Sequence, residues 1–135
     1  MKLIYRLLWI FIALNGAAFV GLNAYASHAK RFVDYPQFLT IFESATTQHA
    51  IHVLALLVIA VVSLIRPSRW LVMSAGFFTL GIVLFSYTLY LFSVTGVKIA
   101  GFLTPIGGVC FMLGWLSLIG IAVTKTSPAA ERINE

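Results

Sequence analysis

WLVMSAGFFTLGIVLFSYTLYLFSVTGV, the stretch from Trp70 to Val97, contains no Lys, Arg, Asp or Glu. At a rise of about 1.5 Å per residue, a helix of this length can cross a hydrocarbon core of about 30 Å. Three further stretches lack charged residues and are long enough in the same way: Leu7–Ala29, Ser44–Ile65 and Ile99–Thr124. The sequence therefore predicts an all-α membrane protein that crosses the bilayer four times.

The composition supports a single bundle embedded in lipid. Of 135 residues, 61% are hydrophobic and 10% are charged, whereas about a quarter of the residues of a soluble domain are charged. We expect one antiparallel bundle of four transmembrane helices, with a short amphipathic outer helix between the first and the second span. The spans are expected at about residues 5–28, 45–65, 70–95 and 99–124, followed by a polar tail at 127–135.

Of the connections between spans, the one between the first and the second is long enough to form secondary structure of its own. Pro36 interrupts it, and apolar residues then recur at helical spacing, at Phe38, Ile41, Phe42 and Ala45. This spacing predicts an amphipathic helix that leads into the second span. We interpret it as an anchor in the outer headgroup region, with a short lid over the bundle as the alternative.

The basic residues indicate the topology. Six of them flank the spans on one side (Lys2, Arg6, Arg66, Arg69, Lys125 and Arg132) and three on the other (Lys30, Arg31 and Lys98). Because basic segments stay in the cytoplasm, both termini are expected there. The basic residues behind the net charge of +5 are then expected to face the anionic headgroups of the lipid bilayer. We expect no nucleic-acid partner.

Two other interpretations concern targeting. Met1–Ala26 also resembles a secretory signal, with Ala24-Tyr25-Ala26 as a small-residue cleavage site, although its apolar part is long for a signal peptide. A mitochondrial membrane is the other alternative. The N-terminal sequence does not resemble an amphipathic leader rich in Arg and Ser, so a bacterial inner membrane is preferred.

Polar side chains at membrane depth are the best indication of a site, because they are costly in lipid. Antiparallel helices would bring five of them to a similar depth in the outer half: His28, His52, Ser86, Tyr90 and Thr104. His28 follows a stripe of small residues that includes Gly21, which we expect to face a neighbouring helix. His49 is expected at the rim of this polar core.

Three interpretations of the polar core remain open. In the first, the histidines are hydrogen-bonded and fix the helix register. In the second, His28, His49 and His52 bind a metal ion or a haem, because histidine is a common metal ligand. In the third, the core conducts protons or a small molecule. The sequence itself requires no cofactor.

Catalytic groups are scarce in the spans. None of the four charge-free stretches contains a carboxylate, so a Ser-His-Asp arrangement cannot form at depth. The single cysteine, Cys110, excludes an internal disulfide and is read as a small apolar residue. We therefore expect a protein that is not an enzyme.

Several segments resemble the YgdD-like family of small integral membrane proteins, which has bacterial and eukaryotic branches. The family's Gly-Ala-Phe-Gly-Ala-His-Ala pattern corresponds to Asn23–Ala29, which keeps His28 but lacks both glycines. The resemblance continues through Ile51–Leu56, which keeps His52, Leu84–Tyr90, the intact Thr104-Pro105-Ile106-Gly107-Gly108, and Gly114-Trp115. Pro105, Gly107, Gly108 and Gly114 are expected to allow close helix packing.

The resemblance implies a four-helix inner-membrane protein and no established activity. Some bacterial members resemble factors linked to membrane integrity and stress tolerance. Our leading hypothesis is a non-enzymatic protein that supports envelope integrity or binds a partner, either a second copy or another membrane protein. The alternative is binding or transport of a small molecule, a proton, a metal ion or haem through the polar core.

Overall fold

The computed structural model describes residues 3–98 and 101–123, and all secondary structure in this part is helical. The elements are α1 (Leu3–His28), α2 (Lys30–Asp34), α3 (Pro36–Ile65), α4 (Arg69–Gly81), the π-helix η1 (Ile82–Tyr87), α5 (Thr88–Thr95), α6 (Leu103–Ser117) and α7 (Ile119–Val123). Four helical units are long and apolar enough to span a membrane: Leu3–His28, Pro36–Ile65, Arg69–Thr95 and Leu103–Val123. The predicted fold class is confirmed. The expected tail at 127–135 and the expected start of the fourth span at residue 99 lie outside the described residues.

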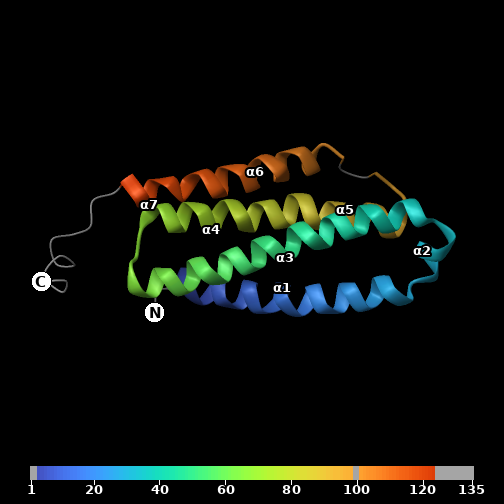
Figure 1. Ribbon diagram of the computed structural model, residues 1–135, viewed down its shortest axis with the longest axis horizontal. Helices are drawn as coiled ribbons and strands as arrows, with labels where there is room; N and C mark the ends of the chain where they lie inside the picture. The colour runs from blue at the N-terminus through green and yellow to red at the C-terminus, as the bar shows by residue number, and fades with distance from the viewer. Residues whose placement is uncertain (1–2, 99–100, 124–135) are drawn as a thin grey trace, which may run out of the picture.

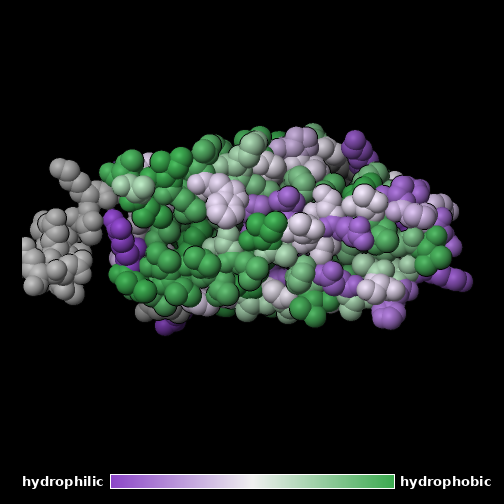
Figure 2. Space-filling model, viewed as in Figure 1, coloured by the Kyte–Doolittle hydropathy of each residue, from purple (hydrophilic) through white to green (hydrophobic). Residues whose placement is uncertain are grey.

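The four spans run antiparallel along the long axis of the molecule (Figure 1). α1 and α6 lie at opposite sides of the bundle, with α3 and the α4–α5 span between them. α2 and the start of α3 lie at the outer end, opposite the start of α1 and the end of α7. Figure 2 shows a mainly hydrophobic surface toward the end where α1 begins and more hydrophilic residues toward the outer end.

The predicted amphipathic outer helix is not a separate element, because Pro36–Ile65 is one continuous helix of 30 residues. Pro36 is well placed to begin it, since a proline in the first turn removes no hydrogen bond. No glycine or further proline interrupts the helix. Phe42 and Ala45 of the amphipathic face are buried in the bundle, so this face packs against protein. The expected position of this segment in the outer headgroup region stays a prediction. At about 45 Å, α3 also exceeds the thickness of the hydrocarbon core.

The buried residues form two apolar clusters at different depths. The inner cluster contains Ile12, Val53, Phe78 and Phe111, among others. The outer cluster is formed by Phe32, Phe42, Ala45 and Tyr90. On α3, His49 lies between Ala45 of the outer cluster and Val53 of the inner one, so a polar layer separates the two.

Glycines and aromatic rings interlock between α4 and the last span. A side chain added at Gly81 would overlap the ring of Phe111, and one added at Gly114 would overlap the ring of Phe78. Gly120 meets the indole of Trp70 in the same way. Each glycine thus makes room for a ring from the facing helix, which is how membrane helices pack without a hydrophobic driving force.

The backbone of the π-helix η1 lies close to Gly107 of the fourth span. An added Cβ at Gly107 of α6 would lie 2.5 Å from the backbone nitrogen of Phe85, 2.8 Å from its Cβ and 2.9 Å from the carbonyl carbon of Leu84. Gly107, which we expected to allow close packing, therefore lies against the backbone of η1. π-Turns inside α-helices are rare and are found frequently at functional sites.

Candidate functional site

A buried polar cluster, formed by Asn15, His49, Tyr87 and Tyr90, connects three of the four spans. Asn15 is the thirteenth of the 26 residues of α1, and His49 is the fourteenth of the 30 residues of α3. Both are therefore near the middle of the length of their helices. His49 is fully buried and Asn15 is 4% exposed. We refer to these four residues as the midplane cluster, after the position of Asn15 and His49 midway along their helices.

The hydrogen bonds of the midplane cluster assign its donors and acceptors. Asn15 Nδ2 donates to the carbonyl oxygen of Phe11 at 2.8 Å, which turns Asn15 Oδ1 toward the other helices. This oxygen accepts from the Tyr87 hydroxyl at 2.5 Å and from His49 Nε2 at 3.0 Å. Because an amide oxygen can only accept, Nε2 of His49 carries a proton. In the neutral imidazole, Nδ1 then accepts from the Tyr90 hydroxyl, at 3.1 Å.

Local sequence explains why α1 presents Asn15. Six residues of α1 recur at steps of four and three and are buried or half-buried: Leu8, Ile12, Asn15, Phe19, Leu22 and Ala26. This spacing is the apolar seam of a left-handed helix pair. An amide in lipid needs partners, and α3 supplies one with His49. The large residues of this seam, rather than the small ones, face the bundle.

His52 belongs to a second polar contact, on another face of α3. Trp115 Nε1 donates to His52 Nε2 at 3.1 Å, and His52 Nδ1 is 2.7 Å from the carbonyl oxygen of Gln48. Since an indole nitrogen can only donate, Nε2 is the acceptor and Nδ1 carries the proton. The His52 ring also stacks on Phe111, with centroids 3.5 Å apart. Both of its nitrogens are engaged.

Replacing Trp115 by phenylalanine tests this contact. We expect the free energy of unfolding, measured by SDS titration in mixed micelles, to fall by about 0.5–1.5 kcal/mol, because one net hydrogen bond is lost. Trp9→Phe is the control, since the Trp9 indole makes no hydrogen bond within the described part of the chain. Equal losses in the two variants would mean that ring size, and not the bond to His52, sets the effect.

The structure does not bring the predicted polar core together. Tyr90 belongs to the midplane cluster, and His52 pairs with Trp115. Thr104 is half-buried near the start of α6. Ser86 is fully buried in η1, and its hydroxyl has no hydrogen-bond partner among the described residues. His49, which we expected at the rim of this core, is fully buried near the middle of α3 and forms hydrogen bonds with Asn15 and Tyr90.

The predicted orientation of α1 is also wrong. His28 and Gly21 are exposed, and nothing lies within 4 Å of an added Cβ at Gly21. The small-residue stripe therefore faces away from the bundle, because the seam through Asn15 faces inward. Of the other expected packing residues, Gly114 is tightly packed, Gly108 is in ordinary contact with the Phe85 ring, and Pro105 is exposed.

The metal set His28, His49 and His52 does not assemble. Within residues 3–98 and 101–123, no three His, Cys, Asp or Glu side chains are grouped so that they could hold a metal ion. His28 lies on the exposed face of α1, while Tyr90 and Trp115 engage the acceptor nitrogens of His49 and His52. A metal or a haem iron would have to displace both donors.

Sequence reasoning did not include Asn15, Tyr87 and Trp115 in the site. The signal for Asn15 was available, because it is a polar residue in the middle of a span and lies in the seam of large apolar residues. Tyr87 could not be found from helical periodicity, because η1 changes the phase of the helix at that point.

Comparison with known proteins identifies the family. The family model described as "Protein of unknown function (DUF423)" matches residues 22–108. A UPF0382 membrane protein of Staphylococcus aureus is 37% identical over 119 residues, which cover 84% of this chain and 93% of that protein. The UPF0382 inner membrane protein YgdD of Escherichia coli is 36% identical over 116 residues, 85% of this chain and 88% of the relative. No solved structure gives a significant match.

These matches confirm the resemblance to the YgdD-like family that the sequence motifs indicated. The matched region includes three members of the midplane cluster and the Gly107 contact. The four spans and the inner-membrane relative agree on the location. The chain belongs to the DUF423 family and is a multi-pass protein of the bacterial inner membrane.

Proposed function

We propose that this protein is not an enzyme and that it acts by lateral association in the bilayer, supporting envelope integrity as a self-associating scaffold. The observation that carries the proposal is the outward face of α1. In an apolar stretch of 18 residues of α1, 11% are buried, against 39%, 33% and 28% in the corresponding stretches of the other three spans. α1 is thus the helix with the most surface available to a neighbour.

The exposed face of α1 suits contact with another helix. Ala13, Ala17, Gly21 and Ala24 follow one another at steps of four and three, and all four are exposed. Small residues at this spacing let two helix backbones approach closely, and association in lipid depends on such packing. The same face continues into Asn23, Ser27 and His28, whose polar groups can form hydrogen bonds across an interface.

A second copy of the chain is the partner that this face favours. The α1 segment from Leu7 to Ala29 carries no charge that would select a partner of opposite charge. Two copies in the same membrane share one orientation, so a twofold axis along the membrane normal brings equivalent residues together. Small residues then face small residues along the whole contact.

Disulfide cross-linking in native membranes tests this association. In a Cys110→Ala background, Gly21→Cys and Ala24→Cys are expected to form cross-linked dimers on oxidation, because equivalent positions meet at the axis. Val58→Cys is the control, since Val58 is 61% exposed on α3 and lies away from α1's outward face. Gly21→Ile should abolish cross-linking at residue 24 while leaving the monomer folded, because nothing lies within 4 Å of its Cβ.

The envelope role has its own measurement. In a bacterial host that lacks its copy of the protein, the wild-type chain should restore detergent resistance and Gly21→Ile should not. Cross-linking at Val58 as strong as at Gly21 would indicate random collision and contradict the scaffold. Normal detergent resistance with Gly21→Ile would show that the envelope role does not depend on self-association through α1.

The alternative function through the polar core has weaker support. Proton or small-molecule transport needs a path, but His49 is fully buried and both of its ring nitrogens are engaged by Asn15 and Tyr90. Metal or haem binding needs free acceptor nitrogens, which His49 and His52 do not offer. The hydrogen bonds of the midplane cluster favour a role in fixing the helices.

A further inference from the structure

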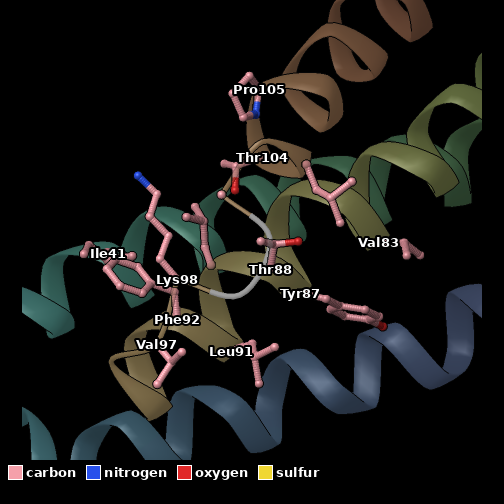
Figure 3. A pocket seen from close by; sticks show the side chains of 13 residues that line it. Ile41, Val83, Tyr87, Thr88, Leu91, Phe92, Val97, Lys98, Thr104 and Pro105 are labelled. Carbon is pink, nitrogen blue, oxygen red and sulfur yellow. The ribbon is translucent and has the colours of Figure 1, made fainter.

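A groove opens toward the lipid at the outer end of the third and fourth spans. It has a volume of about 510 Å³ and lies between η1–α5 and the start of α6 (Figure 3). Lys98 and Thr104 line its outer end, while Val83 and Tyr87 line its deep end. We refer to it as the outer groove.

The dimensions of the outer groove fit a hydrocarbon chain. From Val83 to Thr95 the span rises by about 18 Å, slightly more than half of a hydrocarbon core of about 30 Å. A groove of about 510 Å³ along such a length has room for a single acyl chain.

The chemistry of the walls agrees with an acyl chain. Most lining residues are apolar, including Val83, Leu91 and Pro105. The hydroxyl of Tyr87 is committed to Asn15, so the ring presents its apolar face to the groove. No charged group other than Lys98 is among the lining residues.

Lys98 supplies a positive charge at the mouth of the groove. A Cβ added at Gly101 would lie 3.0 Å from Lys98 Cγ and 3.1 Å from Cδ, so the lysine stem lies across the glycine backbone. Within residues 3–98 and 101–123 its ammonium has no carboxylate partner. Arg31, another cation at this end, is already engaged: its Nε donates to the carbonyl oxygen of Ser93 at 2.7 Å, and its guanidinium lies over Phe38.

We propose that the outer groove binds an anionic glycerophospholipid of the outer leaflet. One acyl chain lies along the groove toward Tyr87, and the phosphate pairs with Lys98. An ammonium at the level of the headgroups attracts an anionic lipid, and the stem of a lysine packs well on apolar surface. The bound chain also contacts the Tyr87 ring, whose hydroxyl belongs to the midplane cluster, so the lipid stabilises the folded bundle.

Native mass spectrometry of the full-length protein, delipidated in detergent, tests the proposal with phosphatidylglycerol and phosphatidylcholine as probes. The wild-type protein should retain phosphatidylglycerol preferentially, and Lys98→Gln should lower that retention about fivefold. Lys30→Gln removes a cation from α2 at the same end of the molecule and should change little. Phosphatidylglycerol should also raise the melting temperature of the wild-type protein more than that of Lys98→Gln.

Leu91→Trp tests the position of the tail. The larger ring fills the groove and should lower retention of both lipids, while the unliganded protein keeps its melting temperature because Leu91 is 46% exposed. Equal losses with Lys98→Gln and Lys30→Gln would show a diffuse attraction and overturn the headgroup assignment. Unchanged retention in Leu91→Trp would overturn the groove. None of these variants alters α1, so the results do not depend on self-association.

Discussion

Gly107→Ala is expected to lower the free energy of unfolding by about 1–3 kcal/mol, the usual cost of adding a methylene to a packed core. The added Cβ would lie 2.5 Å from the Phe85 nitrogen and 2.9 Å from the carbonyl carbon of Leu84. These are backbone atoms of the π-helix η1 and cannot rotate away as a side chain can. α6 must therefore move outward, which loosens the contacts of Phe111 and Gly114 as well. Gly107→Val should cost more.

The neighbouring glycine supplies the control. An added Cβ at Gly108 meets only the Phe85 ring, at 3.9 and 4.0 Å, which is ordinary van der Waals contact. Gly108→Ala should therefore change the unfolding free energy, measured by SDS titration in mixed micelles, by only a few tenths of a kcal/mol, since alanine also favours the helix. If both alanine variants lost the same stability, a general intolerance of α6 would explain the result, and the close approach to η1 would be wrong.

The spans were predictable because hydrocarbon excludes charge, and this requirement is local in the sequence. The tight packing of Gly107 and Gly114 was predictable for a related reason, because close helix contacts in lipid need residues without bulk. The rotation of α1 about its own axis, which decides which face points into the bundle, was not predictable. A helix in a membrane can be apolar on every side, so periodicity does not distinguish the face toward protein from the face toward lipid. The stripe through Gly21 fits a contact within the chain and a contact between chains equally well.

The candidate site was predictable only in part, because the position of His49 within its helix depended on where α3 begins. A start at residue 45 put His49 about one turn from the helix end, whereas α3 begins at Pro36 and has His49 near the middle of its length. Asn15 would have indicated the inward face of α1 better than the stripe of small residues did. An amide in lipid needs hydrogen-bond partners, whereas a small residue does not. Its partners could not be paired in advance, because η1 shifts the phase of Tyr87 relative to the residues before it.

Asn15→Leu is expected to destabilise the protein by about 1–3 kcal/mol. The change keeps the apolar volume in the seam of α1 but removes the acceptor of both Tyr87 and His49. A buried donor without a partner costs about 1–3 kcal/mol. In membranes the measured values are lower, about 0.6 kcal/mol on average, because the unfolded chain also finds partners in lipid. Asn15→Leu leaves two buried donors without an acceptor, so the loss of unfolding free energy should be large enough to measure by SDS titration.

Asn23 is a matched control on the same helix. Its Nδ2 donates to the carbonyl oxygen four residues back, at 3.0 Å, as Asn15 does, but Asn23 is exposed. Asn23→Leu should leave the stability of the monomer unchanged, since Asn23 makes no hydrogen bond to another helix among the described residues. A loss equal to that of Asn15→Leu would mean that the local bond to the helix backbone matters and that the bond to His49 does not.

A double-mutant cycle separates the Asn15–His49 bond from the other effects of each substitution. His49→Leu alone leaves Asn15 with Tyr87 and leaves the Tyr90 hydroxyl without its acceptor. The double variant Asn15→Leu and His49→Leu removes both partners, so it should be more stable than the sum of the single losses predicts, by about 0.5–2 kcal/mol. Purely additive losses would show that the two side chains do not interact. Coupling of this size would mean that the hydrogen bond between Asn15 and His49, rather than the small residues of α1, fixes how the first span joins the bundle. The outward face of α1 would then be available for a second copy.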